Sequence, residues 1–145
     1  MFRKISDNTN CNCLDGTHED LTSLFVRKVR KAPDIKDADF RNQIELNKIP
    51  TNNDCNEICG MHGVSIEIWN DESEEVLKDK YRKTAAFGPN LKKSLAIFKF
   101  NHNNGLIKHT PEQFEYNEFH YDFYKHDIFK VSELNLIKML PLKEL

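Results

Sequence analysis

The stretch CNEICGMHGVSIEIW, residues 55–69, contains the two features that decide how this chain folds. In its second half Val64, Ile66 and Ile68 alternate with other residues, so that they share one side of an extended chain. Strict alternation of this kind is typical of a β-strand with one buried face. Its first half is polar and contains two of the protein's four cysteines. We therefore expect a strand over 63–69, preceded by a segment with a chemical role of its own.

Further strands are predicted on both sides of this one. Alternation and β-branched or aromatic residues indicate strands over 22–30, 93–100, 106–110 and 118–127. Residues 22–30 also match a helical stripe, so a helix there stays open. The segment HNNG, 102–105, predicts a tight turn that joins its two neighbouring strands as a hairpin.

Helical patterns occupy two of the remaining segments. Residues 34–48 and 70–83 combine apolar residues at helical spacing with suitable terminal residues. Residues 132–140 fit either a short helix or a final strand, and residues 51–63 have the composition of a loop. Mixed strands and helices predict a single small α+β domain over 1–145, with a mixed or antiparallel sheet and two to three helices.

Composition narrows the functional classes. The 145 residues include 30% charged residues and give a formal net charge of -2 at pH 7. Nucleic-acid affinity depends on a positive surface, so a general nucleic-acid binder is not expected. No segment approaches the roughly 20 apolar residues of a membrane-spanning helix, so no membrane association is expected. The first residues, MFRKISDNTNCNC, lack the apolar centre of a signal peptide, which predicts a cytoplasmic protein.

The four cysteines form two close pairs, Cys11 with Cys13 and Cys55 with Cys59. Stable disulfides are rare in the reducing cytosol, where closely spaced cysteines more often bind metal. Zinc prefers four ligands in a tetrahedron, and thiolates bind it well. We therefore predict that the four sulfurs hold one structural Zn²⁺, which fastens a polar arm of residues 1–20 to the body of the domain.

Two histidines leave the ligand set open. His18 and His62 each follow a cysteine pair at short distance, so either could replace one sulfur. Both ligand sets fill the four positions around the ion and leave none for a reacting water. The predicted metal centre would therefore stabilise the fold and would not catalyse a reaction.

A second polar group lies on the strand expected over 118–127. His120, Asp122, Tyr124 and His126 alternate along it and would share one side. An imidazole beside a carboxylate can act as an acid–base pair. The alternative interpretation is the solvated face of an amphipathic strand, which is routine in antiparallel sheets.

A third group is defined by its order along the chain. Arg27 lies in an early strand, Ser65 in a middle strand, and a late acid follows, either Glu115 or Glu118. This order is similar to the Arg–Ser–Glu order of ADP-ribosyltransferases, which bind NAD. No surrounding motif accompanies it, so the order alone does not assign the chain to that family.

Two functions are consistent with these patterns. The first is a non-catalytic, zinc-stabilised module that binds another protein through exposed aromatic side chains of its C-terminal third. The second is a small enzyme that uses the face of His120, Asp122 and His126, either a hydrolase or an NAD-dependent enzyme similar to ADP-ribosyltransferases. The sequence names neither a partner nor a substrate.

Overall fold

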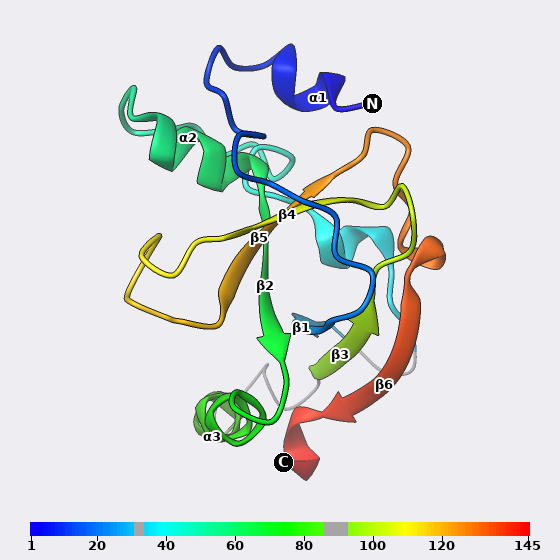
Figure 1. The fold of residues 1–145 in the computed structure, drawn as a ribbon. Helices are drawn as coiled ribbons and strands as arrows, with labels where there is room; N and C mark the ends of the chain where they lie inside the picture. Colours follow the sequence, from blue (N-terminus) through cyan, green and yellow to red (C-terminus); the bar gives the residue numbers. More distant parts are fainter. Residues whose placement is uncertain (31–33, 86–92) are drawn as a thin grey trace.

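The computed structural model describes residues 1–30, 34–85 and 93–145. They contain a six-stranded sheet in the order β4-β5-β2-β1-β3-β6, with every neighbouring pair antiparallel (Figure 1). The strands are β1 (Leu24–Val29), β2 (Val64–Trp69), β3 (Ser94–Lys99), β4 (Gly105–His109), β5 (His120–Lys125) and β6 (Asn135–Pro141). The helices are α1 (Arg3–Ser6), α2 (Cys55–His62) and α3 (Glu74–Ala85), with 3-10 turns at Asp37–Phe40, Val131–Glu133 and Leu142–Glu144. This architecture is compatible with the predicted α+β class.

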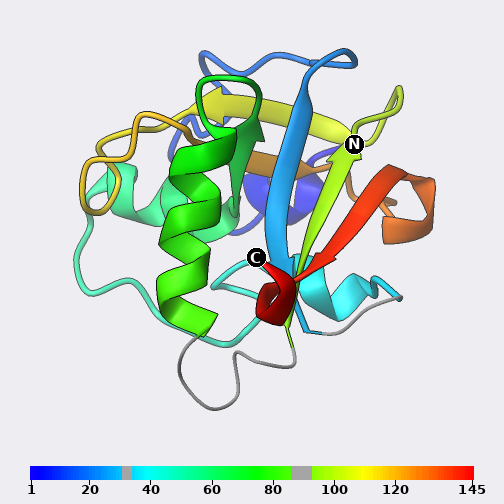
Figure 2. The same cartoon turned by 90° about the horizontal axis from the view of Figure 1, so that it is seen from below.

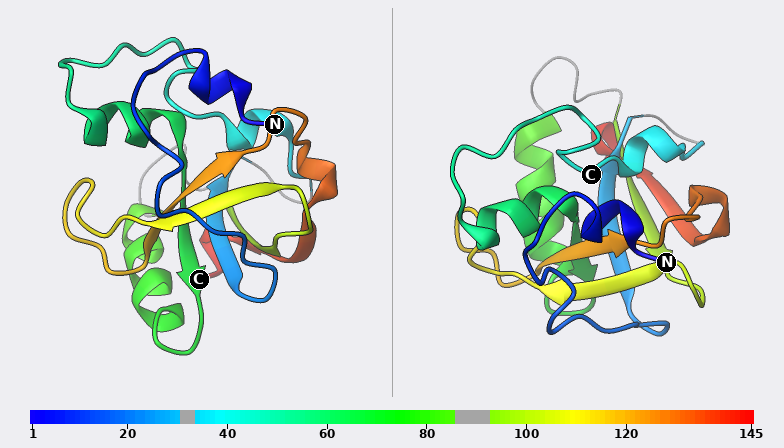
Figure 3. Two further views of the ribbon diagram at one scale, coloured as in Figure 1. Left: turned by 45° about the horizontal axis from the view of Figure 1, so that its top comes forward. Right: turned by 90° about the horizontal axis from the view of Figure 1, so that it is seen from above.

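The sheet curls around an apolar core. Residues 100–104 alone join β3 to β4, although these strands lie near opposite edges of the sheet. So short a connection is possible only if the sheet bends back on itself. Figure 3 shows β4 and β5 running across the direction of β1 and β3. The rings of Phe100 and Phe123 meet inside this curve, with centroids 4.4 Å apart.

The predicted hairpin between 93–100 and 106–110 is therefore wrong. The turn itself forms, because the amide of Asn101 donates to Asn104 Oδ1 at 2.7 Å and Asn103 adopts a left-handed φ of 66°. However, β3 pairs with β1 and β6, whereas β4 pairs with β5. After the turn, β4 runs across the core and pairs with β5 instead of returning along β3.

The ambiguous segment 22–30 forms the central strand β1, and the helical alternative is wrong. Phe25 and Val29 pack into the core inside the curve, whereas Val26 packs beneath α3. A strand buried on both faces carries apolar residues without clean alternation, which explains its partial match to a helical pattern. The expected strands over 63–69, 93–100, 106–110 and 118–127 are confirmed as β2, β3, β4 and β5, and the open segment 132–140 contains most of β6.

The helix predictions are confirmed in part. Residues 70–83 contain most of α3, but 34–48 forms only the 3-10 turn Asp37–Phe40. There the Asp39 carboxylate accepts the amide of Lys36 at 2.9 Å and so closes a single short turn. Asn47 then takes a left-handed φ of 63°, which interrupts any helix.

The loop predicted over 51–63 instead contains α2. Asp54 caps this helix, since its side chain accepts the amide of Asn56 at 3.1 Å. Cysteine, asparagine and glycine are weak helix formers, so the sequence of α2 shows little helical propensity. Two disulfides hold α2 to the N-terminal arm, and this covalent attachment stabilises a helix whose sequence has low helical propensity.

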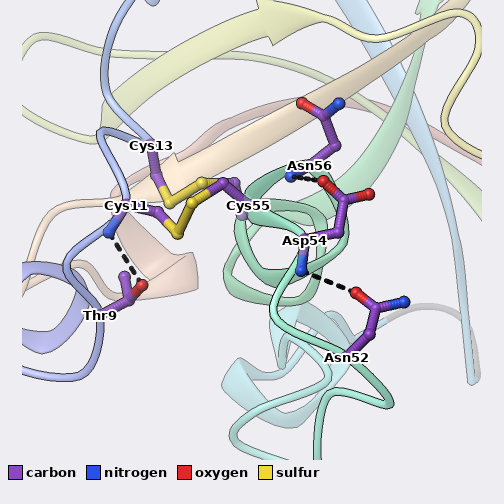
Figure 4. Close-up of a disulfide and its surroundings, with 8 residues drawn as sticks. Thr9, Cys11, Cys13, Asn52, Asp54, Cys55 and Asn56 are labelled. Carbon is purple, nitrogen blue, oxygen red and sulfur yellow. Dashed lines mark hydrogen bonds between the residues drawn. A yellow bond between two sulfur atoms is a disulfide. The ribbon is translucent and has the colours of Figure 1, made fainter.

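The zinc prediction is wrong, because the four sulfurs bond to one another. Cys11 pairs with Cys55 and Cys13 with Cys59, side by side between the arm and α2 (Figure 4). A cysteine in a disulfide has no thiolate to offer a metal. No cluster of three or more potential metal-ligating side chains occurs in the described ranges. The four sulfurs do fasten the arm to the body, but they do so covalently.

The predicted cytoplasmic location is also wrong, because the four cysteines form disulfides. Disulfides persist in oxidising surroundings, and the two bonds point to an extracellular or otherwise oxidising environment. Separately, across 1–30, 34–85 and 93–145, no helix combines the length and apolar character required to cross a membrane.

Candidate functional site

A cavity lies between the sheet and α3, and we call it the α3 pocket. It measures about 920 Å³, within the usual range of small-molecule sites. Its floor is the outer face of β1, β2 and β5, its wall is α3, and its rim is the segment 110–119. Figure 2 shows α3 lying across this face of the sheet. The residues used below are Arg27, Lys28, Ser65, Glu67, Lys80, Tyr81, Phe114, Glu115, Tyr116, Asn117, Glu118 and His120.

Glu67 ties the three parts of the pocket together. Its side chain is buried, and it accepts hydrogen bonds from Lys80 Nζ at 3.0 Å, from Asn117 Nδ2 at 2.8 Å and from the Tyr81 hydroxyl. Burial, followed by the charge of Glu67, raises the pKa of Tyr81, so its phenol keeps the proton that it donates. One carboxylate of β2 thus holds α3 and the rim in register.

Tyr81→Phe tests this anchor. Losing a hydrogen bond to a buried carboxylate should lower the free energy of unfolding by about 2 kcal/mol, measured by urea denaturation. Tyr116→Phe is the matched control, because Tyr116 is 71% exposed and its replacement should change stability by less than about 0.5 kcal/mol. Equal effects of the two variants would contradict the role given to Glu67.

The strands β1 and β2 separate at the pocket. Their pairing ends at Val26 opposite Glu67, and Arg27 occupies the opening beyond it. Its Nη1 donates to the Ser65 carbonyl and its Nε to the Asp39 carbonyl, both at 2.6 Å. These partners are neutral, and no carboxylate forms an ion pair with Arg27 among the described residues. Burial lowers the pKa of Arg27, whereas Tyr81 and then Asp39 act in the opposite direction, and the guanidinium lies 5.6 Å from the centre of the Phe40 ring. Its charge is therefore partly offset within the protein.

Further cations gather beside Arg27. Burial, followed by the charges of Lys93, Lys80 and Arg27, lowers the pKa of Lys28. Repulsion strong enough to act in this way means that the four positive groups share one region. The lining of the pocket also contains three carboxylates, so its cations and acids are equal in number.

The rim presents aromatic rings and acids to solvent. Phe114 and Tyr116 are each 71% exposed, which is unusual for large rings and suits contact with a ligand or partner. Glu115 and Glu118 stand beside them, and neither carboxylate forms an ion pair within the described segments. The rim backbone is held at its end, because the Glu118 carbonyl accepts His109 Nε2 at 2.6 Å.

His120 completes the floor. Its Nδ1 lies 2.9 Å from the carbonyl oxygen of Thr110, and because a carbonyl only accepts, Nδ1 carries the proton. Burial lowers the pKa of His120, which favours the neutral ring. Its Nε2 is then a buried acceptor, and no described residue donates to it. This nitrogen is enclosed by the protein and is not exposed to the pocket.

No protein-family model, curated protein or solved structure matches the chain. The function must therefore be argued from the pocket.

The structure divides the polar face predicted on β5. His120 lines the α3 pocket, whereas Asp122 is buried behind the rim and the Tyr124 hydroxyl donates to the Cys59 carbonyl at 3.1 Å. His126 borders a separate cavity of about 370 Å³ beside α1. His120, Asp122 and Tyr124 are all buried, so this part of β5 is not a solvated face.

The members of the ordered trio, in contrast, all line one cavity. Arg27, Ser65 and both candidate acids, Glu115 and Glu118, line the α3 pocket. Sequence reasoning missed a further carboxylate of the same lining, Glu67, together with its partners on α3 and the rim. The available signal was an acid inside the apolar strand over 63–69, but its hydrogen bonds involve segments 13 to 50 residues away. No regular spacing in the sequence predicts contacts between residues so far apart in the chain.

Proposed function

We propose that this protein binds NAD in the α3 pocket and transfers its ADP-ribose group to an acceptor. The observation that supports the proposal is that Arg27, Ser65 and two late acids, in the order typical of ADP-ribosyltransferases, line one pocket. The cations, exposed rings and acids of that pocket correspond to three separate parts of the NAD molecule.

Charge and shape suit a dinucleotide. Lys28, which forms no ion pair among the described residues, offers positive charge to a pyrophosphate, and ammonium groups are usual phosphate partners. Phe114 and Tyr116 offer flat faces on which a nicotinamide or adenine ring can stack. A volume of about 920 Å³ accommodates a ligand of this size when part of it remains in solvent.

The acids suit cleavage of the glycosidic bond. When the bond between ribose C1′ and the nicotinamide nitrogen breaks, neutral nicotinamide leaves with the electron pair and positive charge develops on the ribose. A carboxylate beside the ribose stabilises that charge, as in glycoside hydrolysis. The acceptor, water or a nucleophilic side chain, then bonds to C1′ and gives its proton to Glu118.

Nicotinamide release from NAD by the disulfide-intact protein tests this function. Glu118→Gln should lower the turnover number about 100-fold, because it removes charge stabilisation of the transition state, while the Kd for NAD changes little. Lys28→Met should instead weaken binding about tenfold, as expected for the loss of one phosphate contact. Calorimetric titration with NAD measures the second effect separately from the first.

Glu112→Gln is the matched control. Glu112 is an exposed acid of the same rim segment that does not line the pocket, so its replacement should leave both measurements unchanged. A folded protein that neither binds NAD at millimolar concentration nor releases nicotinamide would contradict the proposal.

The second candidate is a protein-binding module, favoured by the exposure of Phe114 and Tyr116. Large exposed rings are frequent energetic centres of protein interfaces. The two functions make different demands on the floor of the pocket. A module would lose partner binding on Phe114→Ala but would tolerate Lys28→Met, whereas the enzyme requires both.

A further inference from the structure

The rim segment 110–119 contacts α2 through the partly buried side chain of Gln113. A methyl group placed on Gly60 would overlap the Gln113 amide nitrogen and lie 2.8 Å from its Cδ. Glycine at this position of α2 therefore leaves the space that the Gln113 amide fills. The Gln113 side chain also lies near enough to Asp122 of β5 to lower the pKa of that carboxyl group, which burial raises.

Helix α2 is itself immobilised on the sheet. Cys55 and Cys59 bond it to the N-terminal arm, and the Tyr124 hydroxyl donates to the Cys59 carbonyl. At its end, Gly63 lies so close to β5 that an added Cβ would be 2.8 Å from Asp122 Cβ. The arm, α2 and β5 thus form a rigid support on one side of the rim.

We propose that Gln113 is a positioning residue, which transmits the placement of disulfide-bonded α2 to the rim of the α3 pocket. Its amide fits the hollow above Gly60 and thereby sets where Phe114, Glu115 and Glu118 stand relative to the floor. The effect on catalysis rests on the proposed function, whereas the effect on the placement of the rim does not.

A clash and its relief test the proposal by hydrogen exchange. Gly60→Ala should expel the Gln113 amide and raise amide exchange over 112–118 about tenfold or more, since an overpacked contact of this kind is costly. Gln113→Ala alone should raise it similarly. In the double variant the clash is gone, so Gly60→Ala should add nothing to Gln113→Ala. Glu112→Gln should leave exchange unchanged.

Activity provides a second, separable readout. Gly60→Ala and Gln113→Ala should each lower kcat/KM for nicotinamide release. NAD at saturating concentration should still bind to both variants, because the cations of the pocket are unchanged. If exchange over 112–118 follows the expected pattern in a protein without this activity, the proposed function fails and the positioning role stands. Unchanged exchange in Gly60→Ala and Gln113→Ala would overturn the positioning role whatever the activity.

Discussion

Replacement of all four cysteines by alanine is expected to lower the free energy of unfolding by about 4 kcal/mol. The disulfides join residues 44 and 46 positions apart, and closing a loop of this length removes about 4 kcal/mol of chain entropy from the unfolded state. The two loops are nearly the same loop, because the bonded cysteines are close neighbours at both ends. The second disulfide therefore adds little closure beyond the first.

This redundancy makes the two single-disulfide variants informative. Cys11→Ala with Cys55→Ala should cost only a fraction of the full loss, because the Cys13–Cys59 bond still closes the loop. Removing Cys13 and Cys59 instead should cost somewhat more, since the Cys13 side chain is buried. Urea denaturation of the three variants measures these values. If the losses of the two single-disulfide variants added up to the loss of the four-cysteine variant, the shared-loop account would be contradicted. A metal chelator should not change the stability of any of these proteins.

Asp122→Asn is expected to stabilise the protein at neutral pH by up to about 4 kcal/mol. Asp122 is 1% exposed, and no cation forms an ion pair with it in the described parts of the chain. Burial raises the pKa of its carboxyl group to about 7, from an ordinary value of 3.8. Asparagine has nearly the same shape, carries no charge and offers an N–H group in this position.

The sign of the pH dependence follows from this raised pKa. The folded protein holds the proton of Asp122 more tightly than the unfolded chain does, so the carboxyl group disfavours folding progressively as the pH rises from about 4 to 7. Above pH 7 the group is ionised in both states and the cost is constant. The stability difference between Asp122→Asn and the wild type should therefore be near zero at pH 4, grow up to pH 7 and then level off.

Chemical denaturation at several pH values measures this difference directly. Asp15→Asn is the control, because Asp15 is exposed and its replacement should give a small difference at every pH. A difference for Asp122→Asn that stays flat between pH 4 and 8 would show that the buried carboxyl group is not the titrating group.

Sequence patterns predicted the strands and the helix whose residue types repeat with the period of that secondary structure. The alternation over 63–69 and the terminal charges of 70–83 were sufficient, because one buried face of a strand or helix imposes a period that the chain itself displays. The prediction failed for α2, whose weak helix formers are held by covalent bonds to residues more than 40 positions away. It also failed for 34–48, where Asp39 serves a short turn and Arg30 instead of capping a long helix.

The candidate site was predictable only as an ordering of residues. Arg27, Ser65 and a late acid are visible in the chain, but their place in the lining of one pocket depends on the strand order that brings β1, β2 and the start of β5 together. The partners of Glu67 come from three separate elements, so their distances are properties of the curled sheet and α3.

By itself, then, the sequence determined four strands and most of the long helix, because these depend on neighbours along the chain. Residues 22–30 and 132–140, which form β1 and most of β6, stayed open between strand and helix. Only the tertiary structure decided that the sulfurs bond to each other, that most of the polar face of β5 is buried, and that a pocket lined by both cations and acids opens beside Glu67. Those outcomes depend on which segments, distant in the sequence, bury their apolar surfaces against each other, and this pairing is fixed only when the sheet folds around its core.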